Sequence, residues 1–291
     1  MKIAFGLHGI VGGVGGKYGA GDSKEALEKG YEHNKKYILD HNDCDVFCHT
    51  ATLDRGDEIL DLYNPVKHKF IKQPFFPFPT YHFAGGNGQR IQAHYHKWFS
   101  HQHVSELRKE YEKETGVKYD MMYIGRYDLA WNTIVDFSKF DPNKFWLGNW
   151  NRLKGMGNRD WYKKRLKENL PLIKDNKYIN VDDTGRITSS EDIPLVGYPH
   201  NSEGVIDQWA FSKPENMDMY CTLYNNISTY ITRKPNTWWD GRSTIHDASK
   251  NISHHRLIPC HLEHIGLLDK LDFAFYLHDD FPTVRRLYYG T

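Results

Sequence analysis

Short apolar runs alternate with longer amphipathic segments through the first 71 residues of this chain. The runs at 2–7, 44–50 and 66–71 have the length and composition of strands, and the segments 22–39 and 54–63 have the apolar period of helices. Successive strands joined by helices lie parallel in one sheet, because the helix carries the chain back to the edge where it started. The order therefore predicts an α/β fold with a mostly parallel central sheet and helices on both faces.

The rest of the chain continues this alternation less regularly. A Pro/aromatic loop at 73–83 and a glycine break at 85–88 precede a long helix expected at 89–115. The further expected elements are strands at 119–131 and 145–150, an inserted loop or lid at 151–194, a strand-to-helix unit at 206–226, a helix at 259–268 and a strand at 273–277.

Length and composition limit the classes of protein to consider. The 291 residues are enough for one large α/β domain, and no apolar run approaches the length that spans a membrane. The net charge of +1 lacks the basic excess typical of proteins that bind nucleic-acid backbone. The N-terminal apolar run is too short for a signal peptide, and the four cysteines form no C-x-x-C pair. We therefore expect a cytoplasmic protein with reduced cysteines.

A glycine-rich loop lies between the first expected strand and the first expected helix. Its sequence at 12–18, G-G-V-G-G-K-Y, fails the P-loop pattern because Val11 and Tyr18 occupy positions that need Gly and Ser or Thr. Backbone N–H groups before a helix can still bind an anion, since the helix dipole favours negative charge there. Contact with a phosphate and a loop without any ligand both remain open.

The strand expected at 119–131 ends on charged residues. Arg126 and Asp128 follow the apolar run M-M-Y-I-G at 121–125. A carboxylate at such a strand end can hold Mn²⁺ or Mg²⁺, which prefer oxygen ligands and need few carboxylates when a diphosphate supplies the others. Arg126 can pair with that diphosphate or with a carboxylate. The alternative interpretation is a structural ion pair.

Two segments resemble the GT-A-type glycosyltransferases of bacteria and viruses. Residues 119–129 are similar to that family's YD-x-x-x-x-x-R-x-D-L pattern, and a long expected helix precedes them. Residues 207–218, D-Q-W-A-F-S-K-P-E-N-M-D, are similar to the family's D-Q-F-A-h-G-x-x-x-x-M-D pattern. The chain departs from the family in two places: Arg126 replaces the first acidic residue of the usual Asp-x-Asp, and Trp209 stands where Phe is usual.

The resemblance implies a single GT-A-like, Rossmann-like catalytic domain that transfers a sugar from a nucleotide-sugar donor to an acceptor hydroxyl, by default that of a glycan. Residues 1–131 would form the nucleotide-sugar-binding half. Residues 132–291 would form the acceptor-binding half, with an insertion at 151–194. Asp128 would bind the diphosphate or a Mn²⁺ or Mg²⁺ ion, and Asp207 would activate or orient the acceptor hydroxyl.

The same resemblance suggests further residues of the site. Contacts to the nucleotide and its phosphates are expected from His8, Gly9, Arg90, Arg126 and Arg285. A histidine of the tail, His261 or His278, would complete the shell of the metal. Asp207 has a competing structural interpretation as the N-cap of the helix that follows it.

Three other functions stay open. The resemblance to viral glycosyltransferases implies a hydroxymethylated base in DNA as another acceptor, and aromatic stretches at 75–79, 146–150 and 238–240 would suit a sugar or an extruded base. The missing acidic residue favours a non-catalytic carbohydrate-binding protein on a degenerate transferase fold. The 17 histidines suggest a metal hydrolase as a further possible function, but the histidines of the long helix lack the i, i+4 spacing of a zinc helix.

Overall fold

The computed structural model shows a mixed α/β protein. It describes residues 1–11, 23–77, 88–149, 172–174, 177–179, 205–232, 254–277 and 280–289. The glycine-rich loop at 12–18, most of the insertion at 151–194, the aromatic stretch at 238–240 and His278 lie outside the described residues.

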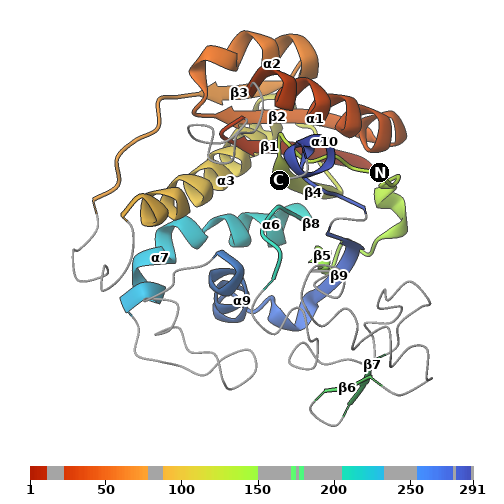
Figure 1. The fold of residues 1–291 in the computed structure, drawn as a ribbon, viewed down its shortest axis with the longest axis vertical. Helices are drawn as coiled ribbons and strands as arrows, with labels where there is room; N and C mark the ends of the chain where they lie inside the picture. The colour runs from red at the N-terminus through yellow and green to blue at the C-terminus, as the bar shows by residue number, and fades with distance from the viewer. Residues whose placement is uncertain are drawn as a thin grey trace.

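A seven-stranded sheet forms the centre of the described part of the chain (Figure 1). Its strands, in spatial order, are β3 (Lys67–Phe70), β2 (Asp43–Thr50), β1 (Lys2–Gly9), β4 (Met121–Arg126), β8 (Trp209–Ser212), β5 (Phe145–Asn149) and β9 (Leu271–Tyr276). All of them run in one direction except β8, which is antiparallel to both of its neighbours. The prediction of a mostly parallel central sheet is confirmed.

The N-terminal elements follow the predicted β-α-β-α-β order. Helix α1 (Ser23–Tyr37) joins β1 to β2, and helix α2 (Gly56–Tyr63) joins β2 to β3. The first helix ends before the predicted residue 39, because the chain tightens there into a 3-10 turn at Leu39–His41. The second ends at Tyr63, and the next residue, Asn64, has a left-handed backbone (φ 41°) and donates its N–H to the Leu60 carbonyl.

Helices cover both faces of the sheet (Figure 1). The remaining ones are α3 (Gly88–Thr115), α6 (Pro214–Cys221), α7 (Leu223–Thr232), α9 (His254–His264) and α10 (Val284–Tyr289). Helices α1 and α2 share a buried core with Phe5 of β1. Helices α3, α6, α7 and α9 share a second core with Ala4, which points to the opposite face of the same strand. Helix α10 packs on α1, where Tyr288 lies 2.9 Å from a ring nitrogen of His33.

The elements after β4 shift relative to their predicted positions. The expected strands at 145–150 and 273–277 correspond to β5 and β9, and the strand-to-helix unit to β8 followed by α6. The helix predicted at 259–268 begins earlier, at His254, and contains Pro259 in its interior. A separate two-stranded ladder, β6 (Leu172–Lys174) with β7 (Lys177–Ile179), lies within the expected insertion. Of the helices in the described ranges, none has both the length and the apolar character needed to cross a bilayer.

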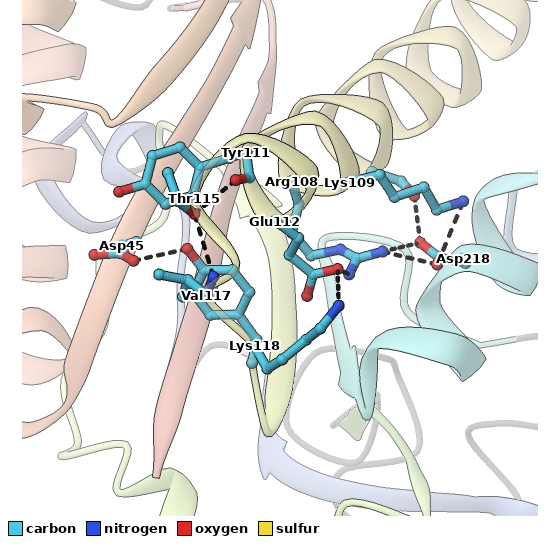
Figure 2. Close-up of polar contacts among 11 residues, drawn as sticks. Asp45, Arg108, Lys109, Tyr111, Glu112, Thr115, Val117, Lys118 and Asp218 are labelled. Carbon is cyan, nitrogen blue, oxygen red and sulfur yellow. Dashed lines mark hydrogen bonds and ion pairs between the residues drawn. The ribbon is translucent and has the colours of Figure 1, made fainter.

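A charged network fastens the C-terminal half of α3 to α6 (Figure 2). The Arg108 side chain, only 3% exposed, donates two hydrogen bonds to Asp218 at 2.7 and 2.8 Å and pairs with Glu112 at 2.8 Å. Ser105 and Lys109 contact the same carboxylate of Asp218 at 2.5 and 3.3 Å. A buried guanidinium requires such partners, so this network fixes how α3 lies against its neighbour.

Two glycines let helices approach the sheet closely. A Cβ at Gly6 would lie 2.4 Å from Cγ1 of Val104, so α3 passes directly over β1. A Cβ at Gly30 would lie 1.9 Å from the carbonyl oxygen of Tyr127, so α1 presses on the chain immediately after β4. Both contacts help to set the positions of the carboxyl ends of β1 and β4.

Candidate functional site

The candidate site lies at the carboxyl ends of β1 and β4. The chain runs outward from β1 through β2 to β3, and α3 then carries it back to place β4 on the other side of β1. The connections that follow these two neighbouring strands therefore run in opposite directions. Open α/β sheets bind ligands at the carboxyl ends of such a strand pair, where the order of the strands reverses. The two strand ends carry His8, Gly9, Arg126 and Asp128. Gly9 has a φ of 101°, a conformation that favours glycine.

His8 and Arg126 lie on the α3 side of the sheet. Ala4 and Ile124 belong to the core beneath the helices of that side, and the two-residue period of a strand puts His8 and Arg126 on the same face. His8 and Arg126 are also register partners across the ladder of β1 and β4. The ring of His101, from α3, lies 4.0 Å from the ring of His8, measured between centroids.

Asp207 joins this edge from β8. Because β8 is antiparallel to β4, the residues just before β8 lie at the carboxyl end of β4. Lys97 of α3 donates a hydrogen bond to the Asp207 carboxylate at 2.7 Å and a second to its backbone carbonyl. The carboxylate, 18% exposed, also lies 3.7 Å from Nδ1 of His255. Burial alone would raise the pKa of Asp207, but the ammonium of Lys97 holds it well below its ordinary value.

Arg126 and Asp128 form a second ion pair at the same edge. Nε and one terminal nitrogen of Arg126 donate to the two carboxylate oxygens at 2.7 and 2.6 Å. The Arg126 side chain remains 39% exposed. The Asp128 carboxylate raises the pKa of Arg126, and Asp207 contributes in the same direction. The two ion pairs are thus electrostatically coupled, and together they balance two positive with two negative charges.

The imidazoles beside these pairs are neutral near pH 7. Burial first, and then neighbouring imidazoles and the cation Lys97, lower the pKa of His8, His101 and His254 well below the ordinary value. Within the described part of the chain, neither ring nitrogen of His8 or His101 has a hydrogen-bond partner. His254 lies 2.9 Å from a ring nitrogen of His94 on α3. These rings therefore add no charge to this edge of the sheet.

The structure brings together five of the predicted site residues, and it separates His261 from them. The five that meet at this edge are His8, Gly9, Arg126, Asp128 and Asp207. His261 is buried among α6, α7 and α9, where its ring nitrogens lie 2.6 Å from the Tyr230 hydroxyl and 3.1 Å from the Met219 carbonyl oxygen.

For two of the residues predicted to contact phosphate, the structure describes only the position of the backbone. Arg90 lies in the first turn of α3. Arg285 follows Val284, whose N–H donates to the Asp128 carbonyl at 2.8 Å, so the start of α10 adjoins the strand end. Both remain predictions, because their side chains lie outside what the structure describes.

Sequence analysis missed four residues of the site. Lys97 and His101 come from α3, and His254 and His255 from the start of α9. The first pair could have been found from the sequence. His94, Lys97 and His101 follow one another at spacings of three and four residues, which places them on one face of a helix. The α9 pair carries no comparable pattern.

The described residues do not fit the expected metal ion. Both carboxylate oxygens of Asp128 accept hydrogen bonds from Arg126, and Asp207 is bonded to Lys97. In the described ranges, no three His, Cys, Asp or Glu side chains lie close enough together to hold an ion. Dependence on manganese or magnesium therefore stays a prediction.

No protein-family model matches the chain, and no curated protein is significantly similar to it.

Proposed function

We propose that the protein is a glycosyltransferase that moves a sugar from a nucleotide-sugar donor to an acceptor hydroxyl. One observation carries the proposal: the pairs Arg126–Asp128 and Lys97–Asp207 meet at the carboxyl edge of a mostly parallel sheet, at a switch point of its topology. Asp128 and Asp207 are the two carboxylates that the resemblance to GT-A-type enzymes assigns to the site. The sheet, with helices on both faces, is compatible with that fold.

Arg126 is the group best suited to the donor's diphosphate. Its guanidinium is partly exposed, and its planar fork of N–H groups matches phosphate oxygens. Negative charge accumulates on the diphosphate as its bond to the sugar breaks, so a fixed cation there lowers the barrier to transfer. Asp128 holds the guanidinium in place through two hydrogen bonds.

The acceptor would enter from the β8 side, where Asp207 and His255 lie. Neutral and ionised polar groups there can bind a hydroxyl of a glycan. A modified DNA base is the alternative acceptor, and salt distinguishes the two: binding to DNA weakens steeply as salt rises, whereas glycan binding does not.

Nucleotide binding tests the proposal directly. The thermal stability of the protein would be measured with UDP, GDP, CMP and dTDP, each with Mn²⁺ and with EDTA. A ligand at a hundred times its Kd adds about 2.7 kcal/mol, which gives a shift of several degrees. Stabilisation by one nucleotide supports the proposal and identifies the donor class. If every nucleotide leaves the melting temperature unchanged, the proposal is wrong.

A set of variants ties that binding to the proposed site. Arg126→Gln should weaken the affinity for the nucleotide roughly tenfold or more, since a hydrogen bond to a charged group contributes about 1.5–3 kcal/mol. Because this change leaves Asp128 without its partner, Arg126→Gln/Asp128→Asn is the companion variant. Lys139→Gln removes only an exposed ion pair with Asp136 and serves as the control. Equal affinities in all of these proteins would place the nucleotide elsewhere.

A second candidate is a non-catalytic carbohydrate-binding protein. The observation that favours it is that each described carboxylate at this edge is already bonded to a cation. It predicts affinity for a glycan together with no response to any nucleotide, so the same stability screen, extended to oligosaccharides, separates it from a transferase.

A further inference from the structure

The Arg126–Asp128 pair presents its cation, and not its carboxylate, to the surroundings. The Arg126 side chain is 39% exposed, whereas the Asp128 side chain is 13% exposed. Nε and one terminal nitrogen of the guanidinium donate to the two oxygens of the carboxylate at 2.7 and 2.6 Å. A ligand that reaches this strand end therefore meets the guanidinium first, and the carboxylate is largely covered.

The other described carboxylate of this edge is covered in the same way. The Asp207 side chain is 18% exposed and accepts a hydrogen bond from Lys97 at 2.7 Å. Turning either carboxylate toward a metal ion would separate it from its cation, and breaking a buried ion pair is costly. Mg²⁺ also gives up its bound water reluctantly. Neither carboxylate is therefore well placed to bind a divalent ion.

The charge at position 126 has the same consequence. An Asp-x-Asp pattern places two negative charges at one strand end, and these attract a divalent cation. Here Arg126 stands at the first position of that pattern, so its charge and that of Asp128 cancel. Lys97 and Asp207 likewise cancel one another. The four described charges give a divalent cation no net attraction to this edge.

Arg126 retains donors with which to bind a ligand. A guanidinium has five N–H groups, and Asp128 accepts from two of them, one on Nε and one on a terminal nitrogen. The other terminal nitrogen has no hydrogen-bond partner in the part of the chain that the structure describes. The two terminal nitrogens together form the second edge of the planar fork, which matches two oxygens of a phosphate or diphosphate.

We propose that Arg126 takes the place of a divalent metal ion, so that the protein binds its nucleotide and transfers the sugar without Mn²⁺ or Mg²⁺; this inference rests on the proposed function. The free edge of the guanidinium binds the diphosphate, and Asp128 holds the opposite edge. As the bond between the anomeric carbon and the diphosphate oxygen breaks, the electron pair stays on that oxygen, whose charge the guanidinium stabilises. The acceptor oxygen bonds to the anomeric carbon, and its proton passes to the solvent.

The first test uses the unaltered full-length protein. The Kd of whichever of UDP, GDP, CMP and dTDP stabilises the protein would be measured by calorimetry in EDTA, and again with Mn²⁺ or Mg²⁺. The values should agree within about threefold, because a guanidinium is not removed by a chelator. Turnover, measured as release of the nucleotide from its sugar, should also agree within about threefold in EDTA and with either ion.

A second test reverses the charge at this position. Arg126→Asp restores an acidic residue at the first position of the pattern. Its affinity for the nucleotide in EDTA should fall about tenfold or more, since a hydrogen bond to a charged group contributes that much. Mn²⁺ should recover part of the loss, because two carboxylates without a cation attract the ion, and electron paramagnetic resonance would show the Mn²⁺ that the variant binds.

Two further variants serve as controls. Arg126→Gln should bind the nucleotide equally weakly with and without Mn²⁺, because it removes the cation and adds no charge. Lys139→Gln loses only an exposed ion pair with Asp136 and should match the unaltered protein in both conditions. Circular dichroism and the midpoint of urea unfolding would show that each variant is folded, and the comparison on the unaltered protein does not depend on any variant.

The outcomes separate this inference from the proposed function. Nucleotide binding that requires Mn²⁺ or Mg²⁺, turnover that EDTA abolishes, or an undiminished affinity of Arg126→Gln in EDTA would each overturn the inference while the protein still binds a nucleotide. Absence of nucleotide binding to the unaltered protein, with and without the ions, would overturn the proposed function, and the inference with it.

Discussion

Replacing Gly30 with alanine tests whether α1 holds the strand end that bears Arg126 and Asp128. The substitution lies in the middle of a 15-residue helix, where alanine is ordinarily favoured over glycine by about 1 kcal/mol. The structure predicts instead that alanine at this position lowers the stability of the protein. The added Cβ would lie 1.9 Å from the carbonyl oxygen of Tyr127 and 3.0 Å from its carbonyl carbon.

The size of the effect follows from what the new methyl group meets. Backbone atoms cannot rotate away, and Tyr127 itself is buried, so the helix or the strand end must shift. Overpacking of a core costs about 1–3 kcal/mol, and this contact belongs at the upper end of that range. After subtracting the gain in helix propensity, we expect Gly30→Ala to destabilise the protein by about 2 kcal/mol.

Urea unfolding followed by tryptophan fluorescence measures this change as a lower midpoint at constant slope. Glu28→Ala, an exposed substitution two residues away on the same helix, is the control and should stay within about 0.5 kcal/mol of the unaltered protein. A Gly30→Ala protein that is as stable as the unaltered one, or more stable, would refute the close approach of α1. Should the reasoning hold, the variant should also bind the nucleotide more weakly, because the displaced backbone carries Asp128.

Two further predictions concern buried polar groups. Lys97→Met should destabilise the protein by about 3–5 kcal/mol, because it leaves the Asp207 carboxylate buried without its partner. In a double-mutant cycle, the double variant Lys97→Met/Asp207→Asn should recover more than about 1 kcal/mol of that loss. Burial lowers the pKa of His261 to about 4, so between this value and about 6.5 the unfolded chain binds more protons than the folded protein. Stability should therefore fall as the pH drops through that window, by roughly 3 kcal/mol for this group, and urea titrations at several pH values should show a shallower dependence in His261→Gln. An unchanged dependence would mean that His261 is not buried in neutral form.

Local pattern was sufficient to predict the elements around β1 to β4 because each of them is defined by its own residues. The apolar run of β1, the apolar period of α1 and the charged end of β4 are all features of neighbouring positions in the chain. Arg126 and Asp128 were predicted correctly at a strand end for the same reason. The prediction extended β4 too far, to residue 131, because apolar residues return at 129–131 after the ladder has ended; Leu129 makes only an isolated bridge with Thr283.

The partners of these charges could not be predicted in this way. Lys97 reaches Asp207 across 110 positions of sequence, and the contact depends on how closely α3 crosses β1 at Gly6. The proposed metal role of Asp128 was inferred from its own residue type, whereas its described neighbour Arg126 occupies both of its oxygens. His261 was selected as a tail histidine, and the packing of α9 against α7 directs it to Tyr230 instead.

Pro259 shows how a local rule can fail for a reason that bears on function. Proline favours the first turn of a helix, and the sequence predicted a helix that begins at about residue 259. In the structure α9 begins at His254, and the hydrogen bond that proline cannot make is replaced by one from Val205, a residue that precedes α9 by about fifty positions. The replacement costs the helix little, because the His255 carbonyl remains satisfied. It also joins α9 to the strand edge that carries Asp207. A residue that is unfavourable within its own helix is therefore accommodated by the same contact that brings His255 to the candidate site.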